Sequence, residues 1–303
     1  MGAAIELKGL SKHFGAKKAV NEVTLEIQEG HCYGLIGPNG AGKTTTFSMM
    51  CGYLFPTSGT VRVLGHDPTE PGVLKGKVGV LPQDAILPPT WPVGSLLTYY
   101  GRLSNLAEPE KEARAALDRV ALPETWAVQA AALSHGMAKR VSMAQALMGA
   151  PPVVFLDEPT AGLDPKIAAA VRQIIRELKG KSTVVVSSHN LQELEELCDA
   201  TAILDKGVLV TAGSVADITG QSAEFRVQIA KGSPPLEEIR MITGVKAATM
   251  ESNGQVLAVN FDSSKTAPEE AITATVGLLA QKGVLILAVS RGKRLEERVL
   301  QLT

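Results

Sequence analysis

The sequence lacks several features that mark whole classes of protein. Its 303 residues include only three cysteines, Cys32, Cys51 and Cys198, which are far apart and form no CxxC pair. We therefore expect reduced core cysteines with no disulfide or metal role. No stretch approaches the roughly 20 apolar residues of a membrane-spanning helix, and the opening MGAAIELKGL has no apolar run of signal-peptide length. If the protein works at a membrane, another chain must hold it there.

The chain also lacks an excess of charge of one sign, since its formal net charge is -1 and its pI is near 6.5. This balance argues against a protein that binds nucleic acid through bulk positive charge, and we expect no nucleic-acid partner. The composition is 45% hydrophobic and 20% charged, which is typical of a globular protein. The length fits one large domain or two ordinary ones.

Hydrophobic patterning predicts two domains of different kinds. Strand and helix patterns alternate over residues 1–218, on either side of a mainly helical stretch at about 85–150. This alternation predicts an α/β domain with a parallel sheet. Over residues 221–303 the order of patterns is β-α-β-β-α-β, which is the order of a split βαβ or ferredoxin-like unit. We therefore expect a small α+β domain at the C-terminal end of the chain.

The stretch GPNGAGKTT fits the pattern G-x-x-x-x-G-K-[ST] of a phosphate-binding loop. It follows the buried-strand pattern CYGLI and precedes a helical pattern, which is the context that the motif needs. Backbone N–H groups of such a loop point at phosphate oxygens, and the helix N-terminus adds partial positive charge. Lys43 would reach the terminal phosphates and the Thr44 hydroxyl would ligate Mg²⁺. The residues expected to bind the nucleotide are Gly37, Pro38, Asn39, Gly40, Ala41, Gly42, Lys43, Thr44 and Thr45. The alternative is a glycine-rich turn that matches the pattern by chance.

An acidic pair ends a second apolar strand pattern, VVFLDE. Asp157 is the last residue of that strand, where a carboxylate needs a partner such as a metal shell. Glu158 comes next and could polarise an attacking water. Two acids in a loop after a strand are common, so the pair alone is weak support for a site. Together with the phosphate loop, it strongly supports one.

With these motifs the sequence resembles the nucleotide-binding subunit of an ABC transporter over about Ile5 to Gly213. The resemblance depends on GPNGAGKTT, LPQD, LSHGM, VVFLDEPTAGLDP and VVVSSHN in that order. It implies a P-loop ABC cassette with a mixed sheet core, an antiparallel β subdomain and a helical subdomain. It also implies a transport-coupled ATPase that uses ATP and Mg²⁺. Through element order alone, the C-terminal stretch resembles the small domain of bacterial drug, sodium or gliding-type exporter subunits.

The resemblance assigns roles to particular residues. Phe14 matches the aromatic residue that stacks on adenine, and Gln83 matches the glutamine that contacts Mg²⁺ and the attacking water. Glu158 matches the general base, and His189 matches the switch histidine near the γ-phosphate. Without the resemblance, Phe14 could be a core aromatic, Gln83 a solvated loop residue, and His189 a helix cap or a polar residue with a satisfied hydrogen bond. The implied catalytic residues are Glu158, His189, Gln83 and Lys43, and the implied Mg²⁺ ligands are Thr44, Gln83 and Asp157.

The resemblance also implies a homodimer in which two copies enclose two ATP molecules head to tail. The helix that begins at LSHGM would present its N-terminus to the γ-phosphate held by the opposite copy. Ser134 would give its hydroxyl to that phosphate, and Gly136 would let the phosphate approach the backbone. Asp164 matches the loop that crosses to the partner, although before Pro165 it could also be the N-cap of the next helix. His135 stands where the family usually has glycine.

We therefore expect an ATP-hydrolysing subunit that powers a separately encoded membrane transporter, an exporter, from the cytoplasmic face of the cell membrane. The segment WPVGSLLTYY would face the membrane subunit, with Ser95 where relatives often have glutamate. The alternative is a soluble ABC-type ATPase that acts on ribosomes or DNA. The ribosomal kind usually carries two cassettes, and the DNA kind carries coiled coils or zinc modules, none of which is visible. The presence of Glu158, Gln83 and His189 disfavours a cassette that binds ATP without hydrolysing it.

Overall fold

The chain divides into two compact units in the computed structural model. The structure describes residues 2–70, 72–84, 86–220, 223–251 and 254–302. One unit ends at Ala212 and the other covers Gly213–Leu302. The short helix α7 (Val215–Thr219) belongs to the second unit, where it packs against the last helix, α10 (Leu295–Leu302).

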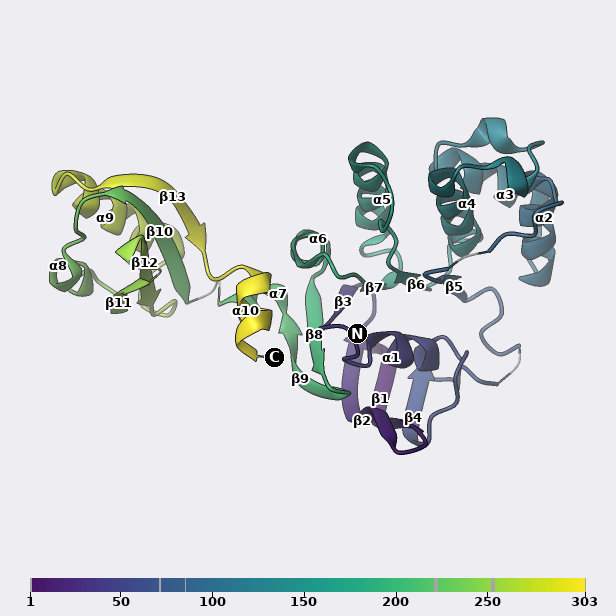
Figure 1. Ribbon diagram of the computed structural model, residues 1–303, viewed down its shortest axis with the longest axis horizontal. Helices are drawn as coiled ribbons and strands as arrows, with labels where there is room; N and C mark the ends of the chain where they lie inside the picture. The colour runs from purple at the N-terminus through teal and green to yellow at the C-terminus, as the bar shows by residue number, and fades with distance from the viewer. Residues whose placement is uncertain (1, 71, 85, 221–222, 252–253, 303) are drawn as a thin grey trace. The chain divides into compact units, whose positions relative to one another are not determined.

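A six-stranded sheet forms the centre of the first unit, in the order β5-β6-β7-β3-β8-β9 (Figure 1). All pairs from β5 to β8 along this order are parallel. Every residue of β3, β6 and β7 is buried, as expected for inner strands of a sheet that is covered on both faces. The strands are β3 (Cys32–Ile36), β5 (Val78–Leu81), β6 (Val153–Asp157), β7 (Thr183–Ser187), β8 (Ala200–Asp205) and β9 (Val208–Ser214).

A second, antiparallel sheet has the order β2-β1-β4. Its strands are β1 (Ala3–Phe14), β2 (Lys17–Gln28) and β4 (Ser58–Val63). Helix α1 (Lys43–Met50) shares a hydrophobic core with both sheets, and its Phe47 ring lies edge-on to Phe155 of β6, 5.6 Å away. The predicted antiparallel subdomain is therefore present, and its core is continuous with that of the central sheet.

Helices make up the part of the first unit between β5 and β6, as the sequence predicts. Helices α2 (Val93–Leu103), α3 (Pro109–Arg119) and α4 (His135–Leu147) pack on one another there, with short 3-10 turns at Pro123–Thr125 and Ala130–Ala132. Helices α5 (Pro165–Leu178) and α6 (Leu191–Leu197) follow β6 and β7. In the part of the chain that the structure describes, no helix is both long and apolar enough to span a membrane.

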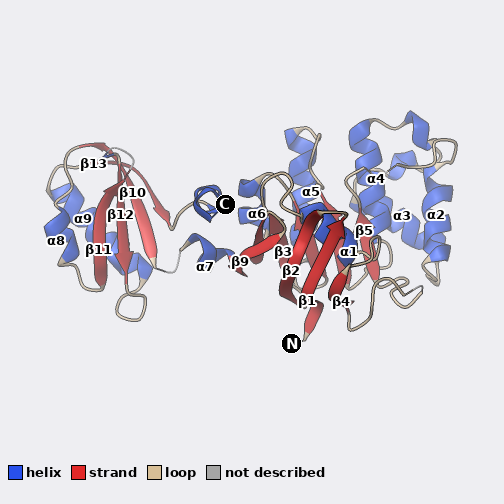
Figure 2. Ribbon diagram, turned by 60° about the horizontal axis from the view of Figure 1, so that its bottom comes forward, coloured by secondary structure: helices blue, strands red, loops and turns tan. Residues whose placement is uncertain are grey.

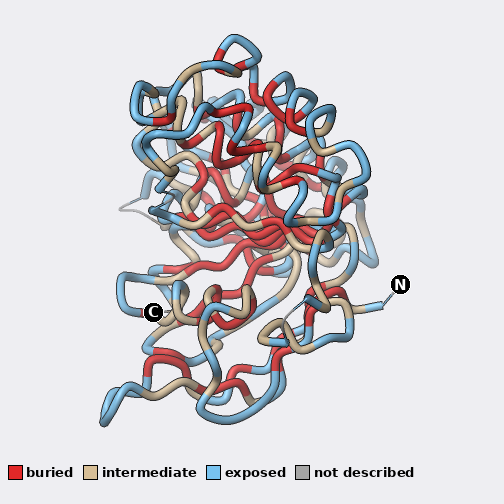
Figure 3. Tube along the Cα trace, turned by 90° about the vertical axis from the view of Figure 1, so that its right-hand side faces the viewer, coloured by how far each residue is buried: buried red, intermediate tan, exposed pale blue. Residues whose placement is uncertain are grey.

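Between α7 and α10, the second unit has the element order β-α-β-β-α-β. Its sheet has the strand order β11-β12-β10-β13 with antiparallel pairing (Figure 2). The rings of Phe225 and Phe261 lie 6.0 Å apart in its buried core, with Ile239 and Leu279 (burial is drawn in Figure 3). The elements are β10 (Glu224–Lys231), α8 (Leu236–Arg240), β11 (Val245–Glu251), β12 (Val256–Phe261), α9 (Pro268–Gln281) and β13 (Leu285–Arg291).

Truncation after Ala212 should leave the first unit folded and able to bind ATP, because the described residues of the core cluster shared by α1 and the two sheets all lie at or before Leu209. Truncation after Thr219 should lower the melting temperature more. It keeps α7 but removes α10, the helix that packs against it, so the buried side chains of Val215 and Ile218 should become more exposed. Thermal unfolding and ATP titration of both truncated chains test this difference. A folded 1–212 chain that fails to bind ATP would contradict the expectation.

Candidate functional site

Parallel strands bring the predicted site residues to one edge of the central sheet. β3 leads into the phosphate loop, β6 ends at Asp157, and β7 ends at Ser187, which pairs with Asp157 in the ladder. A cavity of about 460 Å³ lies at this edge. It is lined by Lys17, Ala19, Asn39, Gly40, Ala41, Gly42, Lys43, Thr44, Thr45, Gln83, Asp157, Glu158, Ala161, Ser187 and His189. The structure therefore gathers most of the predicted phosphate, metal and catalytic residues around one space, and it adds Lys17, Ala19, Ala161 and Ser187.

The phosphate loop ends at Gly42, which is the N-cap residue of α1 and has a φ of 97°. A Cβ atom at this position would lie 2.5 Å from the carbonyl oxygen of Ala19. Both the left-handed backbone and the close approach therefore require glycine. Helix α1 begins directly after this turn, and its first residues, Lys43, Thr44 and Thr45, line the cavity. The N–H groups of a first helical turn have no partner within the helix, and such a terminus favours phosphate.

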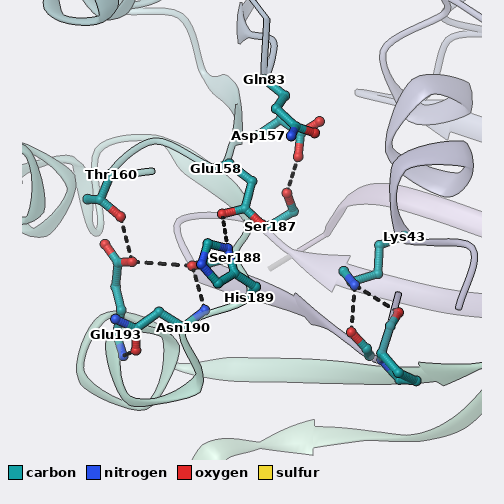
Figure 4. Close-up of polar contacts among 12 residues, drawn as sticks. Lys43, Gln83, Asp157, Glu158, Thr160, Ser187, Ser188, His189, Asn190 and Glu193 are labelled. Atoms are coloured by element: carbon teal, nitrogen blue, oxygen red, sulfur yellow. Dashed lines mark hydrogen bonds and ion pairs between the residues drawn. The ribbon is translucent and has the colours of Figure 1, made fainter. Parts of the chain in front are cut away.

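Lys43 lies over the phosphate loop and bonds to its backbone. Its Nζ donates to the carbonyl oxygens of Gly37 and Pro38, at 2.5 and 3.1 Å (Figure 4). Burial lowers the pKa of Lys43, and the nearby charges of Glu158 and Asp157 act in the opposite direction. The ammonium group is thus held by neutral carbonyls, which a phosphate oxygen can replace as its partner.

Asp157 is a buried carboxylate, with only 6% of its surface exposed. It accepts a hydrogen bond from the Ser187 hydroxyl (Figure 4). Burial raises the pKa of Asp157, whereas the Ser187 bond and the charges of Lys139 and Lys43 lower it. Its carboxylate shares the cavity with the Thr44 hydroxyl and the Gln83 side chain. Carboxylate, hydroxyl and amide oxygens are hard donors of the kind that Mg²⁺ prefers, so these residues fit that ion.

Glu158 takes a backbone conformation that is uncommon for a residue with a side chain. Its φ is 49°, in the left-handed region, and its N–H donates to the carbonyl oxygen of Ser187 at 3.0 Å. Its Oε2 lies 2.8 Å from Nδ1 of His189 (Figure 4). Such local strain persists where the surroundings fix it and is concentrated at functional sites. The N-cap of α6 is Asn190, so the alternative that His189 caps this helix is wrong.

Lys139 lies near the acidic pair Asp157 and Glu158 and was not predicted from the sequence. It belongs to α4, is 6% exposed, and its Nζ donates to the backbone oxygen of Gln83 at 3.0 Å. Burial lowers the pKa of Lys139, and the charges of Asp157, Asp84 and Glu158 oppose that shift. A lysine within a basic helical stretch is ordinarily solvated, so no local pattern signals its burial beside the acidic pair.

Six predicted nucleotide-binding residues are not among those that line this cavity: Gly37 and Pro38 of the phosphate loop, and Phe14, Ser134, Gly136 and Asp164. Phe14, at the end of β1, is 51% exposed with the Lys12 ammonium 5.3 Å from its ring centre, so it is not a core aromatic. Ser134 caps α4 by accepting from the Met137 N–H at 3.3 Å. Asp164 caps α5 and is exposed, and Gly136 lies in the first turn of α4. The N-cap role considered for Asp164 is therefore present.

His135, the first residue of α4, lies beside Gly162 in the loop that precedes α5. The imidazole is exposed, and its Nε2 lies 3.1 Å from the place that a Cβ of Gly162 would occupy. Gly162 has a φ of 73°, so glycine provides both the left-handed turn and the room for the imidazole. Position 135 therefore contacts the chain's own loop rather than only solvent.

Comparison with known proteins gives consistent matches. A sequence model described as "ABC transporter" matches residues 20–161. The Nod factor export ATP-binding protein I of Burkholderia lata is 36% identical over 217 residues, which are 70% of this chain and 71% of that protein. The linearmycin resistance ATP-binding protein LnrL of Bacillus subtilis is 34% identical over 218 residues, 71% of this chain and 70% of that protein. The solved dimeric structure of an ATP-binding cassette in a post-hydrolysis state, bound to ADP and Pi, has a TM-score of 0.64 and 25% identity. That match covers 70% of this chain and 98% of the cassette chain.

Replacement of the loop glycines should distinguish backbone strain from steric clash. Gly42→Ala should lower the free energy of unfolding of the nucleotide-free protein more than Gly40→Ala. Both positions have a positive φ, which costs alanine about 1–2 kcal/mol, but only at Gly42 would the Cβ meet a backbone oxygen. Urea unfolding without nucleotide measures the two losses. Equal losses would show that the contact with Ala19 does not matter.

Proposed function

The chain belongs to the ABC transporter family of ATP-binding proteins, and from this we infer that it hydrolyses ATP to power a separately encoded membrane exporter. The relatives described above carry names that connect them with Nod factor export and with linearmycin resistance. The observation that supports the proposal most directly is the single cavity shared by the phosphate loop, Asp157, Glu158 and His189. An ATPase needs these groups together, because phosphoryl transfer depends chiefly on positioning and charge stabilisation.

The proposed chemistry assigns one task to each part of the cavity. The phosphate loop and the N-terminus of α1 bind the phosphates, and Lys43 exchanges its carbonyl partners for a terminal phosphate oxygen. Thr44, Gln83 and Asp157 would hold Mg²⁺, which neutralises phosphate charge when bound. Glu158 accepts a proton from the attacking water, and the contact with His189 orients its carboxylate.

We propose a homodimer with two ATP molecules between the copies. The exposed N-terminus of α4, with Ser134 and Gly136, is suited to receive the γ-phosphate held by the opposite copy, because it combines an anion-favouring dipole with a hydroxyl. Asp164 is exposed on a loop that packs against the same helix start through His135 and Gly162. A dimeric relative bound to ADP and Pi supports this arrangement.

The membrane subunit would dock on the helical part of the first unit. The rings of Trp91 and Tyr99 lie 5.4 Å apart there, and both are exposed. With Ser95, Trp126 and neighbouring residues they line a cavity of about 480 Å³. Amphipathic aromatic residues are enriched at protein interfaces, so this surface suits a partner helix. Held in this way, the chain would work as a peripheral protein at the cytoplasmic face of the membrane.

Glu158→Gln should keep ATP affinity and lose turnover. The amide has the size of the carboxylate but cannot accept the proton, and the loss of a general base costs roughly 100-fold or more in rate. The substituted protein should therefore accumulate as an ATP-bound dimer. ATP binding, hydrolysis rate and size-exclusion chromatography with ATP test this together. Steady-state hydrolysis within a few-fold of the wild-type rate would remove Glu158 from this role.

Phe14 should bind the base through its ring face and not through hydrogen bonds. Phe14→Tyr should then keep ATP affinity, while Phe14→Ala should weaken it by about 1–3 kcal/mol, the range for base stacking. GTP should compete with ATP to a similar degree, because every base has a π-face. Competition binding with both nucleotides is the measurement. A preference for ATP of about 100-fold would mean that other groups recognise the adenine edge.

A further inference from the structure

Glu193 is a buried carboxylate that lies close to the site but outside its cavity. It belongs to α6 and is only 3% exposed. It does not line the cavity that holds the phosphate loop. Neither nucleotide binding nor proton transfer, as described above, makes use of it.

Both hydrogen bonds to the carboxylate come from segments that carry site residues. Its Oε2 accepts from the Thr160 hydroxyl at 2.7 Å and from the Ser188 hydroxyl at 3.3 Å (Figure 4). Thr160 lies between Glu158 and Asp164, and Ser188 directly precedes His189. The other oxygen, Oε1, is buried and has no hydrogen-bond partner among the residues that the structure describes. One oxygen atom therefore joins the two loops.

A short ring of hydrogen bonds fixes the loop on both sides of His189. The Ser188 hydroxyl accepts from the Asn190 N–H at 3.1 Å, and the Asn190 side-chain oxygen accepts from the Glu193 N–H at 3.1 Å. Beyond this ring, His189 is exposed and its Nδ1 contacts Glu158. The loops are thus joined once at the cavity, through Glu158 and His189, and once in the interior, through Glu193.

We propose that Glu193 is a positioning residue that holds His189 against Glu158 by fastening the His189 loop to the loop from Glu158 to Asp164. This role rests on the proposed ATP hydrolysis. A carboxylate that is buried with only neutral hydroxyl donors stabilises a fold little compared with an apolar side chain of similar size. The geometry therefore points to orientation of the two loops and not to helix stability.

Three substitutions in the 303-residue chain separate the effect of the hydrogen bonds to Glu193 from that of its charge. Glu193→Gln keeps an oxygen that can accept both hydroxyl bonds and places its NH₂ at the unpartnered position, so kcat should stay within about threefold of wild type. Glu193→Leu fills similar volume without an acceptor, and kcat should fall about tenfold or more while ATP affinity stays within about twofold. Glu196→Gln, on the exposed side of α6, is the matched control and should leave both unchanged.

A double substitution tests whether Glu193 acts through His189. In a His189→Ala background, Glu193→Leu should cause no further loss in single-turnover rate, because no imidazole remains to be positioned. Equal losses in both backgrounds, a loss of ATP affinity, or full kcat in Glu193→Leu would each overturn the proposal. If that protein does not fold, Thr160→Val removes one of the two bonds at nearly constant volume, and the same criteria apply to it.

These outcomes are separable from a failure of the proposed function. If the wild-type protein binds ATP but never hydrolyses it, the ATPase assignment fails and Glu193 has no step to support. If the wild-type protein hydrolyses ATP and Glu193→Leu does so equally well, only the role of Glu193 is wrong.

Discussion

The parallel pairing of β6 with β7 is the interaction on which the site depends. It places Asp157 opposite Ser187 at the ends of two fully buried strands, and the β3 strand beside β7 leads into the phosphate loop. Because parallel strands end at the same edge, three segments that are far apart in the sequence meet without any long side chain to bridge them. A slip of one residue in this ladder would turn Asp157 to the other face of the sheet.

Charge balance at the edge of the sheet requires cations from outside the strands. Asp157 is buried, and its charge is offset by Lys43 from the phosphate loop and by Lys139 from the helical part. Each lysine in turn has its pKa lowered by burial and has carbonyl oxygens as its hydrogen-bond partners. The two lysines are thus held by neutral carbonyl dipoles, so their charges can pair with a phosphate.

The sequence predicted the parts of this structure whose chemistry is local. The phosphate loop, the acidic pair at the end of β6 and the alternation of strands and helices each depend on neighbouring residues, and all are present. Lys139 and Glu193 were not foreseen, because each has the spacing of an ordinary solvated charge on a helix. Their burial depends on partners 56 and 33 positions away in the chain, which no local pattern records. The exposure of Phe14 likewise depends on how the end of β1 packs against neighbouring segments. The sequence therefore left open whether Phe14 is a base-stacking ring or a core aromatic.

The bond from Lys139 to Gln83 closes a loop that contains α2, α3 and the first turn of α4. The chain leaves the central sheet after β5, passes Gln83, and is fastened to that same point from the second turn of α4. Separating the start of α4 from the segment after β5 would leave the buried Lys139 ammonium without this acceptor, which costs free energy. The two ends of the helical part are therefore expected to separate together, and hydrogen exchange at β5 and at the start of α4 should report similar opening free energies.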